Sequence, residues 1–509
     1  MEIIKNRLRH FCQQQTGTDL LEESQSVIVP DTHPDVLQIV GANGWLNIQE
    51  KSCSGNLLRI GGQVNCMVCY LPVEGKRPCS ISVSLPFSFI KEIEGMDDNG
   101  RLLSSAHLLH VSASMLNPRK MMVRAQLQVI WKRYRGESVE YIENIMGCGE
   151  DGVHCLFENS EINCIADIIE KRLVLNDEIR LSSPLPDEQS IFLCKKAIWY
   201  TEDVKVLPGK IMIRGHIDAL MTAMDDHGSF LGKSQYTVPF SQIVECDAVQ
   251  PEDRVEVAYS PVREEIEAVT SPDQVTTMQF SFAAVTECLI HKKVPIHAVV
   301  DLFSTKWEMQ SEAAILPMPN DGMVYSMQAS VQEKMVVEGE ATQVLGVSVT
   351  PECTLVHSGE KTLRAGFHIT AIYLEADGTV MTAYRKAYAE APCEEILKSG
   401  LCIGFPEEAT AAVGREGELQ IRFDAELRYV GDALQGQKVI AACAVDRTKP
   451  RTRSGNASLI VRKAEAGESV WSLAKACNTV PSVLASANKL GEQDRIEAGS
   501  LILIPFVSR

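Results

Sequence analysis

Residues Leu58–Gly75 read LRIGGQVNCMVCYLPVEG, and this segment has two counterparts further along the chain. The counterparts are Met212–Gly228, MIRGHIDALMTAMDDHG, and Leu363–Gly378, LRAGFHITAIYLEADG. When Gly62, Gly215 and Ala365 are aligned, a glycine follows thirteen residues later in each copy. The aligned positions are 153 and 150 residues apart, which indicates three copies of one long repeat.

Apolar residues alternate with polar ones in all three segments, which is the period of a half-buried β-strand. The apolar faces hold Ile60, Val64, Cys66, Val68 and Tyr70, then Ile213, Ile217, Ala219 and Met221, then Leu363, Phe367, Ile369, Ala371 and Tyr373. Each segment ends in a polar turn containing glycine, which predicts a hairpin. Later runs alternate in the same way at 123–131, 276–282 and 419–427. We therefore predict a mainly β chain with three antiparallel, sandwich-like domains.

The length of 509 residues fits three or four domains. The predicted division is 1–150 for the first copy with a lead-in, 170–310 for the second, 322–445 for the divergent third, 446–457 for a linker and 458–509 for a terminal module. The stretches near 150–172 and 310–325 are less regular and are expected to join the copies. Within the first of them, Cys164–Leu173 (CIADIIEKRL) has the apolar spacing of a helix.

The terminal module has the pattern of two short strands around two helices. Ser469 is a suitable N-cap, and the helix after it should bury Val470, Leu473, Ala474 and Cys477. Pro481 suits the first turn of a second helix, although Val480 before it is a poor cap. Leu473 and Leu484 are expected in the small core. A final strand, Leu501–Ile504, completes a βααβ unit.

The module closely resembles a LysM domain through Gly467–Ala474, Asn488, Gly499 and Leu503–Pro505. It departs from that family at Glu468, where aspartate is usual. Glycan-binding members hold N-acetylglucosamine in a groove between the first turn and the loop after the second helix. The resemblance places that groove at Gly467, Glu468, Ser469, Val470, Asn488, Lys489 and Leu490. Its mix of charged, hydroxyl and apolar groups favours a protein partner, with Val470 and Leu490 as the apolar anchors. Trp471 either stacks on a sugar or is partly buried, and we favour burial.

Composition and motifs narrow the function. The formal charge of −18 argues against nucleic acid as the main partner. Residues 446–456 are basic, which we interpret as a solvated linker that trypsin should cut readily, in preference to a binding patch.

The first residues lack an apolar export segment, and no stretch is long enough to span a membrane. We find no phosphate loop, nucleophile elbow or zinc-binding helix, so we expect no enzyme activity, no cofactor and no metal. Cys66 and Cys69 form the only close cysteine pair, and no second pair completes a zinc site.

Two further motifs have turn-forming residues. Pro30–Asp35 (PDTHPD) contains two carboxylates, but no other catalytic group accompanies them, so we interpret it as a Pro/Asp turn. Asn117–Lys120 (NPRK) reads as a hairpin turn that could also contact a partner. Four segments resemble SPOCS domains of spore coat assembly proteins. They are Val29–Asp35, the strand around Gly62, Leu85–Phe87 and Leu116–Lys120. That resemblance covers residues 20–310 well and 325–445 weakly.

SPOCS repeats followed by one LysM domain resemble the coat morphogenetic proteins of clostridial spore formers. The resemblance implies a scaffold that binds the coat-assembly ATPase, stage IV sporulation protein A, and anchors other coat proteins. It also implies a location in the mother-cell cytoplasm at the forespore surface, with little or no glycan binding. The alternative is a protein that binds peptidoglycan or N-acetylglucosamine in the cell wall or cortex. The sequence leaves open which face of the repeats binds partners.

Overall fold

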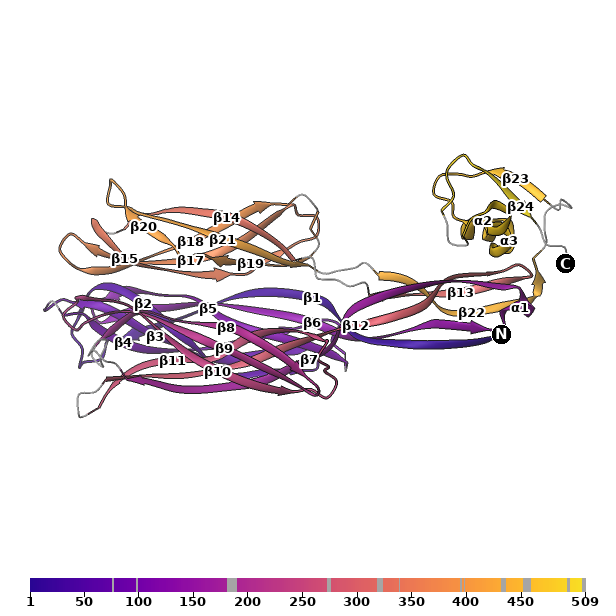
Figure 1. Ribbon diagram of the computed structural model, residues 1–509. Coiled ribbons are helices and arrows are strands. Elements are labelled where there is room, and N and C mark those ends of the chain that lie inside the picture. The colour runs from indigo at the N-terminus through magenta and orange to yellow at the C-terminus, as the bar shows by residue number, and fades with distance from the viewer. Residues whose placement is uncertain are drawn as a thin grey trace.

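The structure is a computed structural model that describes residues 1–75, 77–97, 99–180, 190–271, 276–317, 324–337, 339–393, 396–397, 399–431, 436–451, 459–491 and 495–505. The chain is mainly β, as predicted, with several antiparallel sheets. Three sandwiches form a broad head, a narrow stalk extends from it, and a small module lies beside the end of the stalk (Figure 1). Each sandwich encloses one of the three largest hydrophobic cores.

The first two copies have the same strand arrangement. In each, a three-stranded meander faces a second group of three strands across the core. The first copy consists of β1 (Glu2–Ile28), β2 (Val36–Ser54), β3 (Leu57–Pro72), β4 (Cys79–Glu92), β5 (Gly100–Asn117) and β6 (Lys120–Met146). The second copy consists of β7 (Val153–Arg180), β8 (Ile191–Leu207), β9 (Lys210–Met224), β10 (Phe230–Glu245), β11 (Arg254–Thr270) and β12 (Thr276–Ser304).

The third copy keeps the meander, β15–β17–β18, but its second sheet is more divided. Its strands are β13 (Trp307–Pro317), β14 (Val324–Met335), β15 (Ala341–Glu352), β16 (Thr354–Val356), β17 (Thr362–Glu375), β18 (Val380–Pro392), β19 (Gly400–Pro406), β20 (Thr410–Val413), β21 (Leu419–Gly431) and β22 (Gly436–Pro450). Short helix α1 (Cys148–Asp151) joins the first and second copies. The divergence of this copy therefore affects mainly the sheet opposite the meander.

The predicted repeat is confirmed by the register of the meanders. Gly62, Gly215 and Ala365 all lie on the middle strand, β3, β9 and β17 respectively. Gly62 pairs with Phe87 on the next strand, and Gly215 pairs with Phe240 in the same way. The glycines thirteen residues later, at 75, 228 and 378, all have a positive φ, which explains why a hairpin turn there favours glycine. All the residues predicted for the apolar faces of these strands are buried.

The aligned glycines lie where the neighbouring strand leaves no room for a side chain. A Cβ on Gly62 would lie 2.1 Å from the carbonyl oxygen of Asn47, and one on Gly215 would lie 2.1 Å from that of Tyr200. In the third copy β15 ends with Glu352, which pairs with Gly366, so the ladder does not continue opposite Ala365. The alanine is tolerated because its neighbouring strand has already ended.

Gly62→Ala is therefore expected to lower the free energy of unfolding by about 1–3 kcal/mol, as for other overpacked positions. Gly61→Ala is the matched control on the same strand, because its Cβ would meet only the carbonyl oxygen of Phe87, at 3.6 Å. Denaturant unfolding of the two variants and the wild type measures the difference. Equal losses of stability would contradict the steric explanation.

The stalk is formed by three antiparallel ribbons, one from each copy. They are the outer parts of β1 and β6, the outer parts of β7 and β12, and the pair β13–β22 (Figure 1). Two small cores join the three ribbons, and their buried residues are Leu8, Tyr141, Ile142, Ile145, Ile162, Cys164, Ile296, Ala298, Val299, Leu302, Leu316, Val439 and Ile440. The outermost pairs are Glu2–Met146, Val153–Ser304 and Trp307–Pro450. Each repeat thus begins and ends at the stalk tip.

The helix expected at Cys164–Leu173 is wrong, because β7 runs through it. A register shift lies in this strand, where Ile165 pairs with His291 and Asp167 with Ile290. Cys164 faces the stalk core, Ile168 packs on the first copy and Leu173 lies in the second sandwich. The buried side of β7 changes along this bulged strand, so its buried residues have a helix-like spacing in the sequence.

The expected irregular linkers are also mostly strand. Residues 153–172 belong to β7, residues 310–317 to β13 and residues 324–325 to β14, while 318–323 lie outside the described residues. The copies are joined instead through 147–152 and through Thr305 and Lys306. Both junctions are at the stalk tip, because that is where each long ribbon closes.

Candidate binding site in the C-terminal module

The terminal module has the predicted βααβ order. Its elements are β23 (Leu459–Lys463), α2 (Val470–Cys477), α3 (Pro481–Asn488) and β24 (Leu501–Pro505). The Ser469 side chain accepts a hydrogen bond from the Ser472 backbone N–H, and the Ser472 hydroxyl accepts one from the Ser469 backbone N–H, which completes a capping box. Pro481 occupies the first turn of α3, and Val480 provides no side-chain cap, both as predicted. Leu473 and Leu484 are buried in the small core, which confirms their assignment.

Asn488 holds the last strand against the second helix. Its Oδ1 accepts a hydrogen bond from the Leu503 backbone N–H at 2.8 Å, and its Nδ2 donates to the Leu503 carbonyl at 2.7 Å. Nδ2 also donates to the Leu484 carbonyl at 2.8 Å. Asn488 therefore has a structural role, and its amide is already engaged within the module.

The other predicted groove residues divide between surface and interior. Gly467, with φ 85°, forms the exposed turn before α2, and Lys489 is an exposed left-handed C-cap of α3. Glu468 accepts hydrogen bonds from Arg462 Nη2 at 2.6 Å and from the Glu465 backbone N–H at 2.8 Å.

Leu490 is partly buried against the module core. The assignment of Val470 to the groove is wrong, because its side chain is completely buried in that core. The two predicted apolar anchors thus contribute to module packing.

Trp471 is buried, but against the stalk and not only within the module. Its indole Nε1 donates to Asp301 Oδ2 at 2.9 Å, and its ring packs edge-on against Phe303 with centroids 5.1 Å apart. Lys475 Nζ lies 2.6 Å from Asp301 Oδ1, and Asn478 Nδ2 donates to the Thr305 carbonyl at 3.2 Å. We call this set of contacts between the module and the stalk the docking contact. With its ring engaged there, Trp471 is not available for stacking on a sugar.

Residues 446–451 of the basic stretch contact the stalk and do not form part of a free linker. Residues 446–450 form the end of β22, where Asp446 pairs with Glu308 and Pro450 with Trp307 of β13, whereas 452–458 lie outside the described residues. Arg447 makes a bidentate ion pair with Asp151 of α1, with distances of 2.9 and 2.8 Å, and this guanidinium lowers the pKa of Asp151. Arg451 donates to the Ser304 carbonyl at 3.2 Å and to Asn478 Oδ1 at 3.4 Å. Part of the positive charge of the basic stretch is thus engaged in contacts at the stalk tip, through Arg447 and Arg451.

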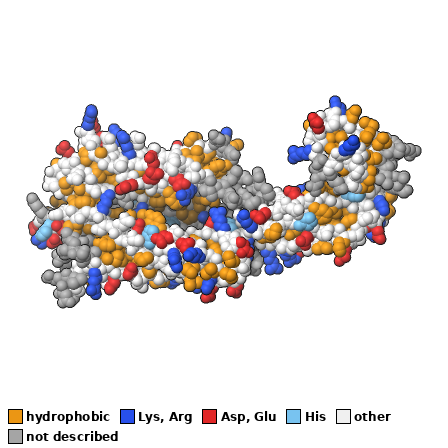
Figure 2. Space-filling view, viewed as in Figure 1, with side chains coloured by type: hydrophobic (Ala, Val, Ile, Leu, Met, Phe, Trp, Pro, Cys, Tyr) orange, Lys and Arg blue, Asp and Glu red, His pale blue; other side chains and the backbone are white. Residues whose placement is uncertain are grey.

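The outer face of the module's small sheet is apolar and exposed, a feature that the sequence reasoning missed. Its four large side chains are Leu459 (50% exposed), Val461 (56%), Leu501 (72%) and Leu503 (39%). Val461 pairs directly with Leu503 across the two strands, while Ile502 and Ile504 point inward to the helices. Hydrophobic side chains are visible on the module's surface in Figure 2. The sequence indicated this exposed face, because Leu459–Val461 and Leu501–Ile504 are apolar at every position and therefore on both faces of each strand.

The two polar motifs of the first copy fold together. Arg119, in the hairpin turn between β5 and β6, donates to the carbonyls of Val29 and His33, both at 2.8 Å. It also pairs with Asp31 at 3.0 Å and with Asp35 at 3.1 Å. Both carboxylates therefore serve one arginine, in agreement with the predicted turn.

Burial keeps the cysteine pair Cys66 and Cys69 in the thiol form. Burial raises the pKa of Cys66 to about 12, and burial also raises the pKa of Cys69. Over the described part of the chain, no group of three or more His, Cys, Asp or Glu side chains is arranged to hold a metal ion. Across the same residues, no helix has both the length and the apolar character needed to cross a membrane.

Comparison with known proteins identifies the module alone. Residues 464–505 match a family described as LysM domain. No curated protein and no solved structure matches the chain. A LysM domain indicates a binding module, so the docked module and its exposed surface are the candidate site.

Proposed function

We propose that this chain is a non-catalytic scaffold of spore coat assembly whose LysM domain binds a protein. The proposed partner is the coat-assembly ATPase, stage IV sporulation protein A, on the forespore surface in the mother-cell cytoplasm. Other coat proteins would attach to the same scaffold. The resemblance of Val29–Asp35 and Leu116–Lys120 to SPOCS domains supports the sporulation role, and these are the segments that Arg119 holds together.

The observation that carries the proposal is the exposed apolar face formed by Leu459, Val461, Leu501 and Leu503. An exposed cluster of large apolar side chains on a small domain is typical of a protein contact surface. A sugar-binding groove needs polar groups that are free to bond hydroxyls. Here Asn488 and Glu468 make hydrogen bonds within the module, and Trp471 packs on the stalk.

Val461→Ser and Leu503→Ser are each expected to weaken binding of the ATPase by about 1–2 kcal/mol, roughly five- to thirtyfold in Kd, if each is a buried anchor of the complex. Both side chains point away from the module core, so the melting temperature should change little. Val336→Ser is the matched control, because that valine is 90% exposed but lies in the third copy. Titration of the purified full chain against the ATPase measures the three affinities.

The alternative is a glycan-binding protein, which the LysM match itself favours. Gly467 and Lys489 remain exposed at the edge of the expected groove. Chitin-type oligomers provide the discriminating ligand. Micromolar binding of these oligomers, together with unchanged ATPase affinity in Val461→Ser and Leu503→Ser, would replace the scaffold proposal by the glycan one.

A further inference from the structure

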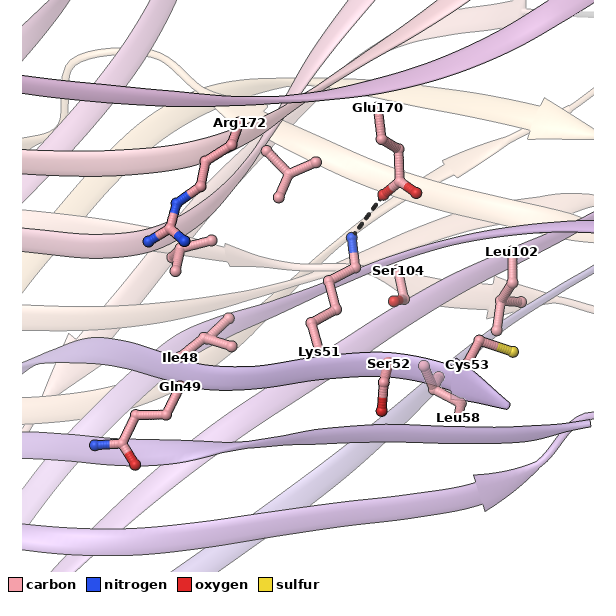
Figure 3. A pocket seen from close by; sticks show the side chains of 12 residues that line it. Ile48, Gln49, Lys51, Ser52, Cys53, Leu58, Leu102, Ser104, Glu170 and Arg172 are labelled. Carbon is pink, nitrogen blue, oxygen red and sulfur yellow. Dashed lines mark hydrogen bonds and ion pairs between the residues drawn. The ribbon is translucent and has the colours of Figure 1, made fainter. Parts of the chain in front are cut away.

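A hollow of about 470 Å³ lies between the first and second copies (Figure 3). It exists because β2 and β11 are paired at one position only, Asn47 with Arg263. Both strands bulge next to this pair, β2 between Ile48 and Glu50 and β11 between Pro261 and Arg263. Pro261 also lacks the N–H that would continue a ladder. The two strand edges therefore separate, and the hollow opens where pairing stops.

The lining combines an apolar wall with a few polar groups. The apolar residues are Ile48, Leu58, Leu102, Val262 and Val285, and the polar ones are Gln49, Lys51, Ser52, Ser104, Glu170 and Arg172. The volume lies within the range of about 300–1,000 Å³ that is common for small-molecule sites, and such sites favour domain interfaces. The hollow has the size and lining of a ligand site.

Ser104 provides an independent sign that a ligand belongs here. Its residue is 3% exposed, and its hydroxyl has no hydrogen-bond partner among the residues that the structure describes. Buried hydroxyls are almost always bonded, because an unpaired one loses its hydration without compensation. A ligand in the hollow could provide the missing partner.

The charged groups favour an anionic ligand. Lys51 Nζ lies 3.0 Å from Glu170 Oε1, and Glu170 is the carboxylate among the lining residues (Figure 3). A second carboxylate, Glu287, lies 3.7 Å from Lys51 but does not line the hollow, and burial raises its pKa. The guanidinium of Arg172 has no ion-pair partner within the described part of the chain. Arginine is a strong donor to planar carboxylates. The lining thus holds two cations, Lys51 and Arg172, and one carboxylate, Glu170.

We propose that this hollow binds a small organic carboxylate with an apolar body. The carboxylate pairs with Arg172, and the apolar body packs against Val262 and Val285. A polar atom of the ligand reaches Ser104. This site is independent of the partner proposed for the terminal module, since it is built from β2, β3, β5, β7, β11 and β12 alone.

The test uses the full chain with hexanoate and benzoate as probes. Hexylamine is the control, because it has an apolar body like that of hexanoate but the opposite charge. Ligand-observed NMR and thermal shift should detect both carboxylates and not the amine. Arg172→Gln should weaken the carboxylates by roughly tenfold, the value of one charge-assisted hydrogen bond. Lys171→Gln removes the same charge from the neighbouring position on β7, which does not line the hollow, and should leave binding unchanged.

Ser104→Ala supplies a second readout. It should raise the melting temperature of the free protein, because an unpaired buried hydroxyl is removed, and it should weaken probe binding by a smaller factor than Arg172→Gln. The proposal fails if neither carboxylate binds, if hexylamine binds equally well, or if Lys171→Gln and Arg172→Gln have the same effect. A fall in the melting temperature of free Ser104→Ala would also count against it.

Discussion

Replacing Leu473 by alanine is expected to unfold the terminal module and to leave the three sandwiches folded. Leu473 is 1% exposed and lies in the core between the two helices and the small sheet. Truncating a buried leucine costs about 2–5 kcal/mol. A domain of this size rarely has more than about 3–5 kcal/mol of stability in total. The loss is therefore expected to remove most or all of the stability of the module.

Leu501→Ala is the matched control, because this leucine belongs to the same module but is 72% exposed. Calorimetry of the full chain should show the module transition lost or strongly lowered in Leu473→Ala only, with the head transition unchanged. Val470→Ala should also lower module stability, since its side chain is completely buried. If Leu473→Ala instead lowered a single cooperative unfolding transition of the whole chain, the module and the head would not unfold separately.

Asp301→Ala is expected to release the module from the stalk. The Asp301 carboxylate accepts the Trp471 indole hydrogen bond and pairs with Lys475, so its removal leaves a buried N–H without its acceptor. Leaving such a donor unsatisfied costs about 1–3 kcal/mol. Because Asp301 belongs to β12, the change does not alter the module's own core. The docking contact should therefore weaken while the module stays folded.

Small-angle scattering should report a broader range of shapes for Asp301→Ala than for the wild type. Trypsin should cut faster after Arg451, which bonds both the stalk and Asn478. Cleavage after Arg447 should stay slow in both proteins, because Asp151 holds its guanidinium in a bidentate ion pair. Lys449 precedes Pro450, and trypsin does not cut that bond in either protein. Asp301→Asn keeps an oxygen for the indole and is expected to have a weaker effect. Identical scattering and cleavage in Asp301→Ala and the wild type would mean that other contacts hold the module.

Some features followed from the sequence because they depend on neighbours only a few residues apart. Strand alternation from Ile60 to Tyr70 requires only that one face of a strand be buried, and it is confirmed. The glycine at 75 is required by the local backbone of one turn. The helices of the module follow from the cap at Ser469, from Pro481 and from apolar spacing. The LysM match at 464–505 agrees with that local reading.

Other features were decided by residues far apart in the chain. Cys164, Ile168 and Leu173 looked helical because each is buried by a different partner along one bulged strand. The stalk depends on three ribbons whose strands are separated by more than a hundred residues, so no local pattern indicated it.

The place of Trp471 is the clearest case. The sequence showed an aromatic side chain suited to burial, but Asp301 and Phe303 lie about 170 residues earlier, and only folding brings them to the helix. Local sequence determined the meander strands of the repeats and the helices of the module, because caps, turns and alternation act over short distances. The tertiary structure alone decided which surfaces are buried against one another, because long-range packing selects among faces that the sequence leaves equivalent.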